Sequence, residues 1–291
     1  MKLSLAALCL AALTFFNVSA QVTVEVMLDQ DQFLPSESLP ATVRITNRSG
    51  QSLHLGADAN WLTFDVESAD GFIVVRHDDP PVVGEFDLGS SEVATKRVDL
   101  APYFVLTQSG RYRIVATVHI KDWNTDVTSA PRGFDIIHGA KLWSQTFGVP
   151  GGPSNQPPEV RKYTLEQANY LRSQLRLYVQ VSDDSESRVF KVETLGKMVS
   201  FGRPEAQLDR LSNLHVLWQN GGAVFTYAVV NPNGEVLETE IYDYVNTRPR
   251  LSADDNGDII VVGGVKRVKA ETIPAVKAPN EMPAPAALTK P

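Results

Sequence analysis

Two acidic and two aromatic side chains near the C-terminal end of the sequence could form a binding surface. Glu238, Glu240, Tyr242 and Tyr244 occur at every second position, and a period of two places such residues on one face of a β-strand. Aromatic rings beside carboxylates are a common composition for a surface that binds glycans. An ordinary half-exposed strand carries the same residue types, so both interpretations stay open. We treat these four residues as candidate glycan-binding residues.

A second cluster, Asp254, Asn256 and Asp258, is a candidate calcium site. Its oxygen-bearing side chains alternate along the chain, as they do at the start of a calcium loop. A complete loop of that type would have Asp at position 252 and Glu at position 263, where the chain has Ser252 and Gly263. The alternative is a tight Asn-Gly turn between two strands.

The sequence contains no motif that would identify an enzyme. It lacks a G-x-S-x-G elbow, an H-E-x-x-H motif, a phosphate-binding loop and a dinucleotide fingerprint. Its histidines show no metal-ligand spacing; they are His54, His77, His119, His138 and His215. The only cysteine, Cys9, lies in the N-terminal segment. We therefore expect no catalytic residue and no cofactor.

The first twenty residues have the composition of a secretory signal peptide. Lys2 is their only charged residue, residues 3–16 are apolar, and residues 18–20 read Val-Ser-Ala before the expected cleavage point. Beyond residue 20 no apolar run is long enough to span a bilayer. The net charge is −7, from 27 basic and 34 acidic residues, which disfavours nucleic-acid binding. We expect a periplasmic or extracellular protein whose partner is an envelope protein or a polysaccharide.

The elements that must position these residues are β-strands. Apolar residues alternate with polar ones in about seven short segments of residues 21–148, separated by turn signals, which is typical of a sandwich. The clearest apolar sets are Val22, Val24, Val26 and Leu28; Ala41, Val43 and Ile45; Leu62, Phe64 and Val66; and Tyr112, Ile114, Ala116, Val118 and Ile120. The predicted fold class is all-β.

Three segments of this first part carry a family resemblance. Phe33-Leu34-Pro35-Ser36-Glu37, the later Val43-Arg44-Ile45-Thr46-Asn47, and Gly110-Arg111-Tyr112-Arg113-Ile114 resemble segments of secreted immunoglobulin-like modules of the macroglobulin and proteinase-inhibitor type. The resemblance implies an immunoglobulin-like β-sandwich and brings no functional residue with it. The chain as a whole is also similar to exported bacterial proteins with this layout, which implies no particular activity.

The second part of the chain contains an internal repeat. Residues 149–160 are rich in proline and glycine and are predicted to be a linker. In residues 161–268, Arg203-Pro204 and the strand pattern after it recur 45 residues later at Arg248-Pro249. Such a period resembles β-propeller repeats, although a second sandwich is also compatible with it. The capping-box pattern that begins at Thr164 predicts a short helix to Leu171, and residues 269–291, mostly Ala, Pro, Lys and Glu, are predicted to be a disordered tail.

Together these observations favour a non-enzymatic, exported binding or scaffolding protein of the bacterial cell envelope. Two alternatives remain. One is a glycan-binding or glycan-degrading accessory protein that uses the second β domain, and the other is a proteinase-inhibitor-like module, which rests on the first-domain resemblance alone.

Overall fold

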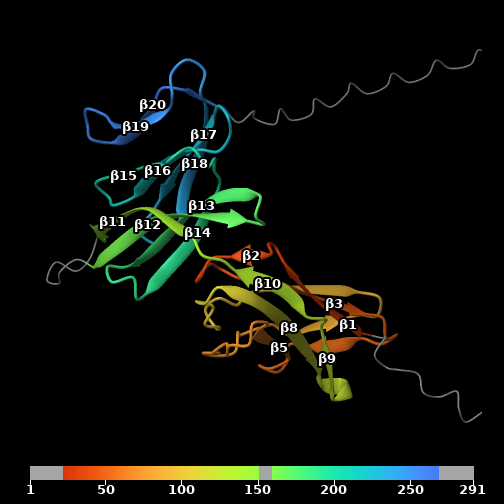
Figure 1. The fold of residues 1–291 in the computed structure, drawn as a ribbon. Helices are drawn as coiled ribbons and strands as arrows, with labels where there is room; N and C mark the ends of the chain where they lie inside the picture. The colour runs from red at the N-terminus through yellow and green to blue at the C-terminus, as the bar shows by residue number, and fades with distance from the viewer. Residues whose placement is uncertain (1–21, 151–158, 269–291) are drawn as a thin grey trace, which may run out of the picture.

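The computed structural model describes residues 22–150 and 159–268, and their architecture is all-β (Figure 1). The expected signal peptide, most of the proline- and glycine-rich segment and the expected tail lie outside the described residues. Among the described residues, the helical structure is one 3-10 turn, η3 (Lys121–Trp123), and no helix is long and apolar enough to cross a membrane.

The first β unit contains two main sheets that share one core. One sheet has the order β1-β3-β7, the other has the order β2-β10-β8-β5 with β9 also paired to β8, and β4 and β6 form a separate pair. The strands are β1 (Val22–Leu28), β2 (Gln32–Phe33), β3 (Pro40–Asn47), β4 (Leu53–Leu55), β5 (Leu62–Ser68), β6 (Phe86–Leu88), β7 (Val93–Asp99), β8 (Gly110–Ile120), β9 (Thr125–Thr128) and β10 (Arg132–Ile136).

Alternation explains which side chains fill this core. In β1 and β8 every second residue is buried, as the sequence pattern predicts, because successive side chains of a strand point to opposite faces. Ile45, Phe64 and Ile114, from three strands, are completely buried in the same cluster. The core therefore joins both sheets.

The second β unit also contains two sheets and an additional hairpin. The sheets have the orders β11-β12-β13-β14 and β15-β16-β17-β18-β21, and β19 pairs with β20. The strands are β11 (Ala140–Gly148), β12 (Val160–Tyr170), β13 (Gln174–Asp183), β14 (Val189–Lys197), β15 (Glu205–Leu208), β16 (Leu214–Gln219), β17 (Val224–Val230), β18 (Val236–Asp243), β19 (Arg250–Ala253), β20 (Ile259–Val262) and β21 (Val265–Lys266).

The five-stranded sheet of this unit is covered on both faces. Val216 and Trp218 of β16 pack on one face against β12 and β13 of the other sheet. On the opposite face, Leu251, with Ile259 and Val261, packs over β16 and β17. The β19–β20 hairpin thus shields the face of the sheet on which the candidate residues of β18 lie.

A polar interface joins the two units. Leu171 N–H donates to Oε1 of Gln32 (2.6 Å), and Nη1 of Arg176 donates to Oε1 of Gln30 (3.2 Å). The guanidinium of Arg176 also lies 3.6 Å from the ring centroid of Tyr170. Leu34 adds an apolar contact by packing with residues of β12, β13 and β14.

The structure corrects the prediction of a helix from Thr164 to Leu171. Residues 160–170 form strand β12, which pairs with β11 on one side and β13 on the other. Both faces of this strand are covered, with Leu165 in one apolar cluster and Ala168 in another. Pairing and packing on both sides outweigh a four-residue capping pattern.

The proline- and glycine-rich segment was expected to link the two units, but it lies within the second one. Strand β11 pairs with β12 up to Gly148 and Val160, and Val149 N–H donates to Glu159 O. The segment therefore connects two neighbouring strands of one sheet, so residues 140–148 belong structurally with the second unit. The chain crosses between the units near residue 138, between β10 and β11.

The repeat corresponds to two hairpins, β15–β16 and β19–β20, in equivalent positions of the 45-residue period. Residues 177–181, whose sequence is similar to the strand of residues 214–218, lie in β13 of the other sheet.

Candidate functional site

Strand β18 brings three of the four candidate glycan-binding residues together. Tyr242 Oη donates a hydrogen bond of 2.7 Å to Oε2 of Glu240, and Nζ of Lys266 on β21 pairs with the other oxygen of that carboxylate. Glu238 is the neighbour of Glu240 on the same face of the strand. Tyr244 lies just beyond the strand and is 46% exposed. We call Glu238, Glu240, Tyr242 and Lys266 the β18 strip.

The turn that precedes β18 sets its direction. Oδ1 of Asn231 accepts hydrogen bonds from the backbone N–H groups of Asn233 and Glu235. Gly234 has a φ of +84°, and a Cβ at this position would lie 2.7 Å from the side chain of Lys191. Both its conformation and its close contact therefore require glycine.

A buried histidine extends the strip across the sheet. Nδ1 of His215 lies 2.7 Å from Oη of Tyr227, and Nε2 lies 3.3 Å from Oδ2 of Asp209. A carboxylate only accepts hydrogen bonds, so Nε2 carries a proton, and in the neutral ring Nδ1 accepts from Tyr227. Tyr227 is the cross-strand neighbour of Glu240. These hydrogen bonds connect the loop after β15 with β16 and β17, and the strand register places Tyr227 beside Glu240 of β18.

Electrostatics differentiates the two carboxylates of the strip. The interaction with the neighbouring carboxylate of Glu240, together with burial, raises the pKa of Glu238. Burial acts to raise the pKa of Glu240, but hydrogen bonds from Lys266 and Tyr242 outweigh it, and the pKa of Glu240 is lowered. Glu240 is thus the carboxylate that stays ionised, and Glu238 is the one that accepts a proton first as the pH falls.

The phenols beside these carboxylates keep their protons. Burial and the nearby charges of Glu238 and Glu240 raise the pKa of Tyr227 to about 12. Burial and the hydrogen bond to Glu240 also raise the pKa of Tyr242. Both hydroxyls are therefore available as neutral hydrogen-bonding groups.

A cleft of about 650 Å³ adjoins the strip. Its walls are Glu238, Thr239, Glu240, Ile241, Lys266, Arg267 and Val268. Consecutive residues of β18 line it, and consecutive residues point to opposite faces. The cleft therefore follows the outer edge of the strand.

The candidate calcium residues form a turn between β19 and β20. Oδ1 of Asp254 accepts hydrogen bonds of 2.9 Å from the N–H groups of Asn256 and Asp258. Gly257 completes the turn with a φ of +79°, and its N–H donates to Asp254 O. In residues 22–150 and 159–268, no group of three or more His, Cys, Asp or Glu side chains is arranged to hold a metal ion.

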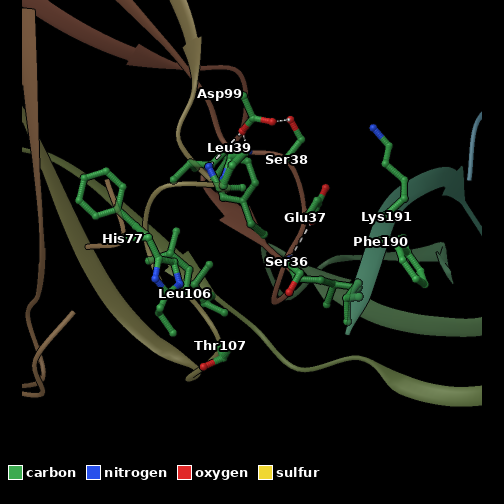
Figure 2. A pocket seen from close by; sticks show the side chains of 18 residues that line it. Ser36, Glu37, Ser38, Leu39, His77, Asp99, Leu106, Thr107, Phe190 and Lys191 are labelled. Carbon is green, nitrogen blue, oxygen red and sulfur yellow. Dashed lines mark hydrogen bonds between the residues drawn. The ribbon is translucent and has the colours of Figure 1, made fainter. Parts of the chain in front are cut away.

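A second cavity, of about 400 Å³, lies between the two units. Figure 2 shows Phe190 and Lys191 of β14 across from Ser36, Glu37 and Ser38 of the first unit. The carboxylate of Glu37 accepts from Leu34 N–H (2.7 Å) and from Gln30 (2.9 Å). Glu37 therefore links the loop after β2 to Gln30, a residue of the polar interface between the units.

Sequence reasoning missed three members of the site: Asp209, Tyr227 and Lys266. Each lies on a different strand or loop from Glu240. The cross-strand register reveals Tyr227 opposite Glu240 and Lys266 opposite Tyr242, and the contact with His215 reveals Asp209. The alternating pattern of β17 marks Tyr227 as a sheet residue, but no local signal assigns its neighbours.

Comparison with known proteins adds no family. No protein-family model matches the chain, and no curated protein matches it. Among solved structures, the chain is similar to Spo0M, a sporulation control protein from Bacillus subtilis, with 11% sequence identity and a TM-score of 0.30. The match covers 72% of this chain and 79% of that chain, and likeness at this level carries no argument about function.

Proposed function

We propose that this is a non-enzymatic binding or scaffolding protein, exported to the bacterial cell envelope, and that the β18 strip with its cleft is the contact surface. The observation that carries the proposal is the cleft of about 650 Å³ along β18, lined by charged and apolar groups. Clefts with a few convergent polar groups are the usual places for ligand contact.

The surroundings of the strip suit recognition because they hold its side chains still. Tyr242 and Lys266 both fix the carboxylate of Glu240, and the β19–β20 hairpin packs on Tyr242. Side chains locked by packing and hydrogen bonds on a sheet lose little conformational entropy when a ligand binds.

The architecture that we propose for the first unit is an immunoglobulin-like sandwich, supported by two sheets around one core. For the second unit we propose a repeat-containing β domain, supported by the two hairpins at a spacing of 45 residues. The signal peptide and export remain part of the proposal and rest on the N-terminal sequence.

Glycan binding is the second candidate function of the same surface. It is favoured by the neutral hydroxyl of Tyr242 beside the carboxylate of Glu240 and by the exposed ring of Tyr244. Carbohydrate hydroxyls would accept from and donate to these groups, and a sugar face would pack on the ring.

A pull-down from a bacterial envelope extract tests the proposal. The immobilised protein should retain a protein or polysaccharide component, and Glu238→Gln should reduce that retention about tenfold, the loss of one charge-assisted contact. Glu25→Gln is the matched control, because Glu25 is also an exposed strand residue but lies on β1 of the first unit. Equal retention by the original protein and Glu238→Gln would remove the β18 strip as the contact surface.

A further inference from the structure

The outer edge of β18 is only partly covered. Strand β21 pairs with Tyr242 and Asp243 alone, and Arg267 N–H donates to Ile241 O. From Val236 to Glu240 no other strand lies beside this edge in the described part of the chain. A strand edge of this kind is a template for pairing with another extended segment.

The direction of the backbone groups along this edge follows from the contact with β21. Because Ile241 O points toward β21, the N–H and C=O of Ile241 and of Thr239 point outward, while those of Glu240 point toward β17. The register with β17 is regular through these residues. Thr239 therefore presents its backbone donor and acceptor to the cleft.

The two faces of the edge differ in chemistry. Glu238 and Glu240 lie on one face. The other face carries Ile241, which is 37% exposed, and the apolar Leu237, which is 59% exposed, is the extra residue of a β-bulge between Val236 and Glu238. A segment added to this edge would place alternate side chains over the carboxylates and over the apolar residues.

An ion pair within the chain indicates that the acidic face of β18 binds a basic side chain. Lys266, on the short strand β21, pairs with Glu240. Glu238, one step further along the open edge, forms no ion pair in residues 22–150 and 159–268. Two copies of this chain joined edge to edge would bring their own Glu238 and Glu240 side chains together, which is unfavourable.

We propose that the outer edge of β18 binds an extended segment of a partner protein in which lysine or arginine alternates with apolar residues. The segment continues the sheet beside β21, with basic side chains toward Glu238 and Glu240 and apolar side chains toward Leu237 and Ile241. This proposal rests on the proposed function and names its partner class; the binding mode is strand addition.

Fluorescence anisotropy with labelled synthetic nonapeptides tests it. An alternating lysine–valine peptide should bind the full-length mature protein, and a peptide of the same composition with lysines and valines in separate blocks should bind about tenfold more weakly, as should an alternating glutamate–valine peptide. Equal binding of the alternating and block peptides would show charge attraction without strand addition and would overturn the proposal.

Two changes separate the backbone contact from the charge contact. Thr239→Pro removes the outward N–H of residue 239 and should abolish peptide binding. The strand should tolerate proline there because this N–H makes no ladder hydrogen bond to β17. If Thr239→Pro does not fold, N-methylation of alternate peptide nitrogens makes the same test from the ligand side. Glu238→Gln should weaken the lysine peptide about tenfold, whereas Glu25→Gln should leave it unchanged.

The remaining outcomes distinguish this proposal from the broader one. Loss of envelope retention in Glu238→Gln, with no binding of any peptide, would leave the proposed function standing and overturn strand addition. Retention of polysaccharide without any protein would also overturn strand addition and would assign the β18 strip to glycan binding. If sedimentation shows a dimer that dissociates in Thr239→Pro, the edge binds a second copy of the chain, and the proposal is overturned.

Discussion

The hydroxyl of Tyr242 and the carboxylate of Glu240, two residues apart on β18, are joined by a hydrogen bond of 2.7 Å. Period two places both on one face, and Lys266 holds the other oxygen of the same carboxylate. Lys266 and this bond together keep Glu240 ionised, while its neighbour Glu238 is the more readily protonated.

Replacement of Tyr242 by phenylalanine should raise the pKa of Glu240, because a hydrogen bond to the ionised form is lost. The titration of the Glu240 carboxyl carbon, followed by NMR, measures this change. Tyr103→Phe in the first unit serves as the control and should leave the Glu240 titration unchanged. An unaltered Glu240 titration in Tyr242→Phe would show that Lys266 alone fixes the charge.

Glu37 should make stability depend on pH. Its side chain is buried, with the residue 7% exposed, and burial raises its pKa in the folded state above the ordinary value of 4.5. The resulting stability is fully present below the unfolded pKa and is lost as the pH rises through the folded pKa. Relative to the original protein, Glu37→Gln should therefore gain in denaturant midpoint as the pH rises from 4 to 7. A constant difference across this range would contradict the raised pKa.

His54, on the surface of the first unit, should also make stability depend on pH. Its ring lies between Asp87 (2.7 Å) and Glu85 (2.5 Å), and hydrogen bonds to these carboxylates raise its pKa above 6.5. The stability that it adds is present below the unfolded pKa and is lost as the pH rises through the folded pKa. The Tm of His54→Asn should fall below that of the original protein at pH 6 and converge with it at pH 9. A Tm difference that is the same at both values would exclude a role for the charged ring.

Asp254 should stabilise the β19–β20 turn through its own backbone contacts. Asp254→Ala removes an acceptor of two N–H groups and should cost about 1 kcal/mol in the free energy of unfolding, the typical value of a capping-type hydrogen bond. Chemical denaturation measures this cost, with Asp255→Ala as the neighbouring control. A rise in Tm on adding millimolar calcium, lost in Asp254→Ala, would instead assign the loop to the metal.

Local patterning accounts for much of the fold. The alternation in residues 22–28 and 112–120 predicts strands and their buried faces, and the structure confirms both. The same rule places Glu238, Glu240 and Tyr242 on one face before any neighbour is known. An Asn-Gly pair at positions 256 and 257 likewise predicts the turn that the structure contains.

The tertiary structure alone decided which strands are neighbours. Residues 164–167 have a local helix signal, yet β12 is a strand because β11 and β13 pair with it on both sides. Asp209, His215 and Tyr227 meet because β16 and β17 adopt one register among several that would bury the same apolar residues. Sequence by itself determined the period and the face of each strand, since these are local properties of the backbone. Pairing, register and the open edge of β18 depend on contacts between distant residues, and those contacts arise only in the folded chain.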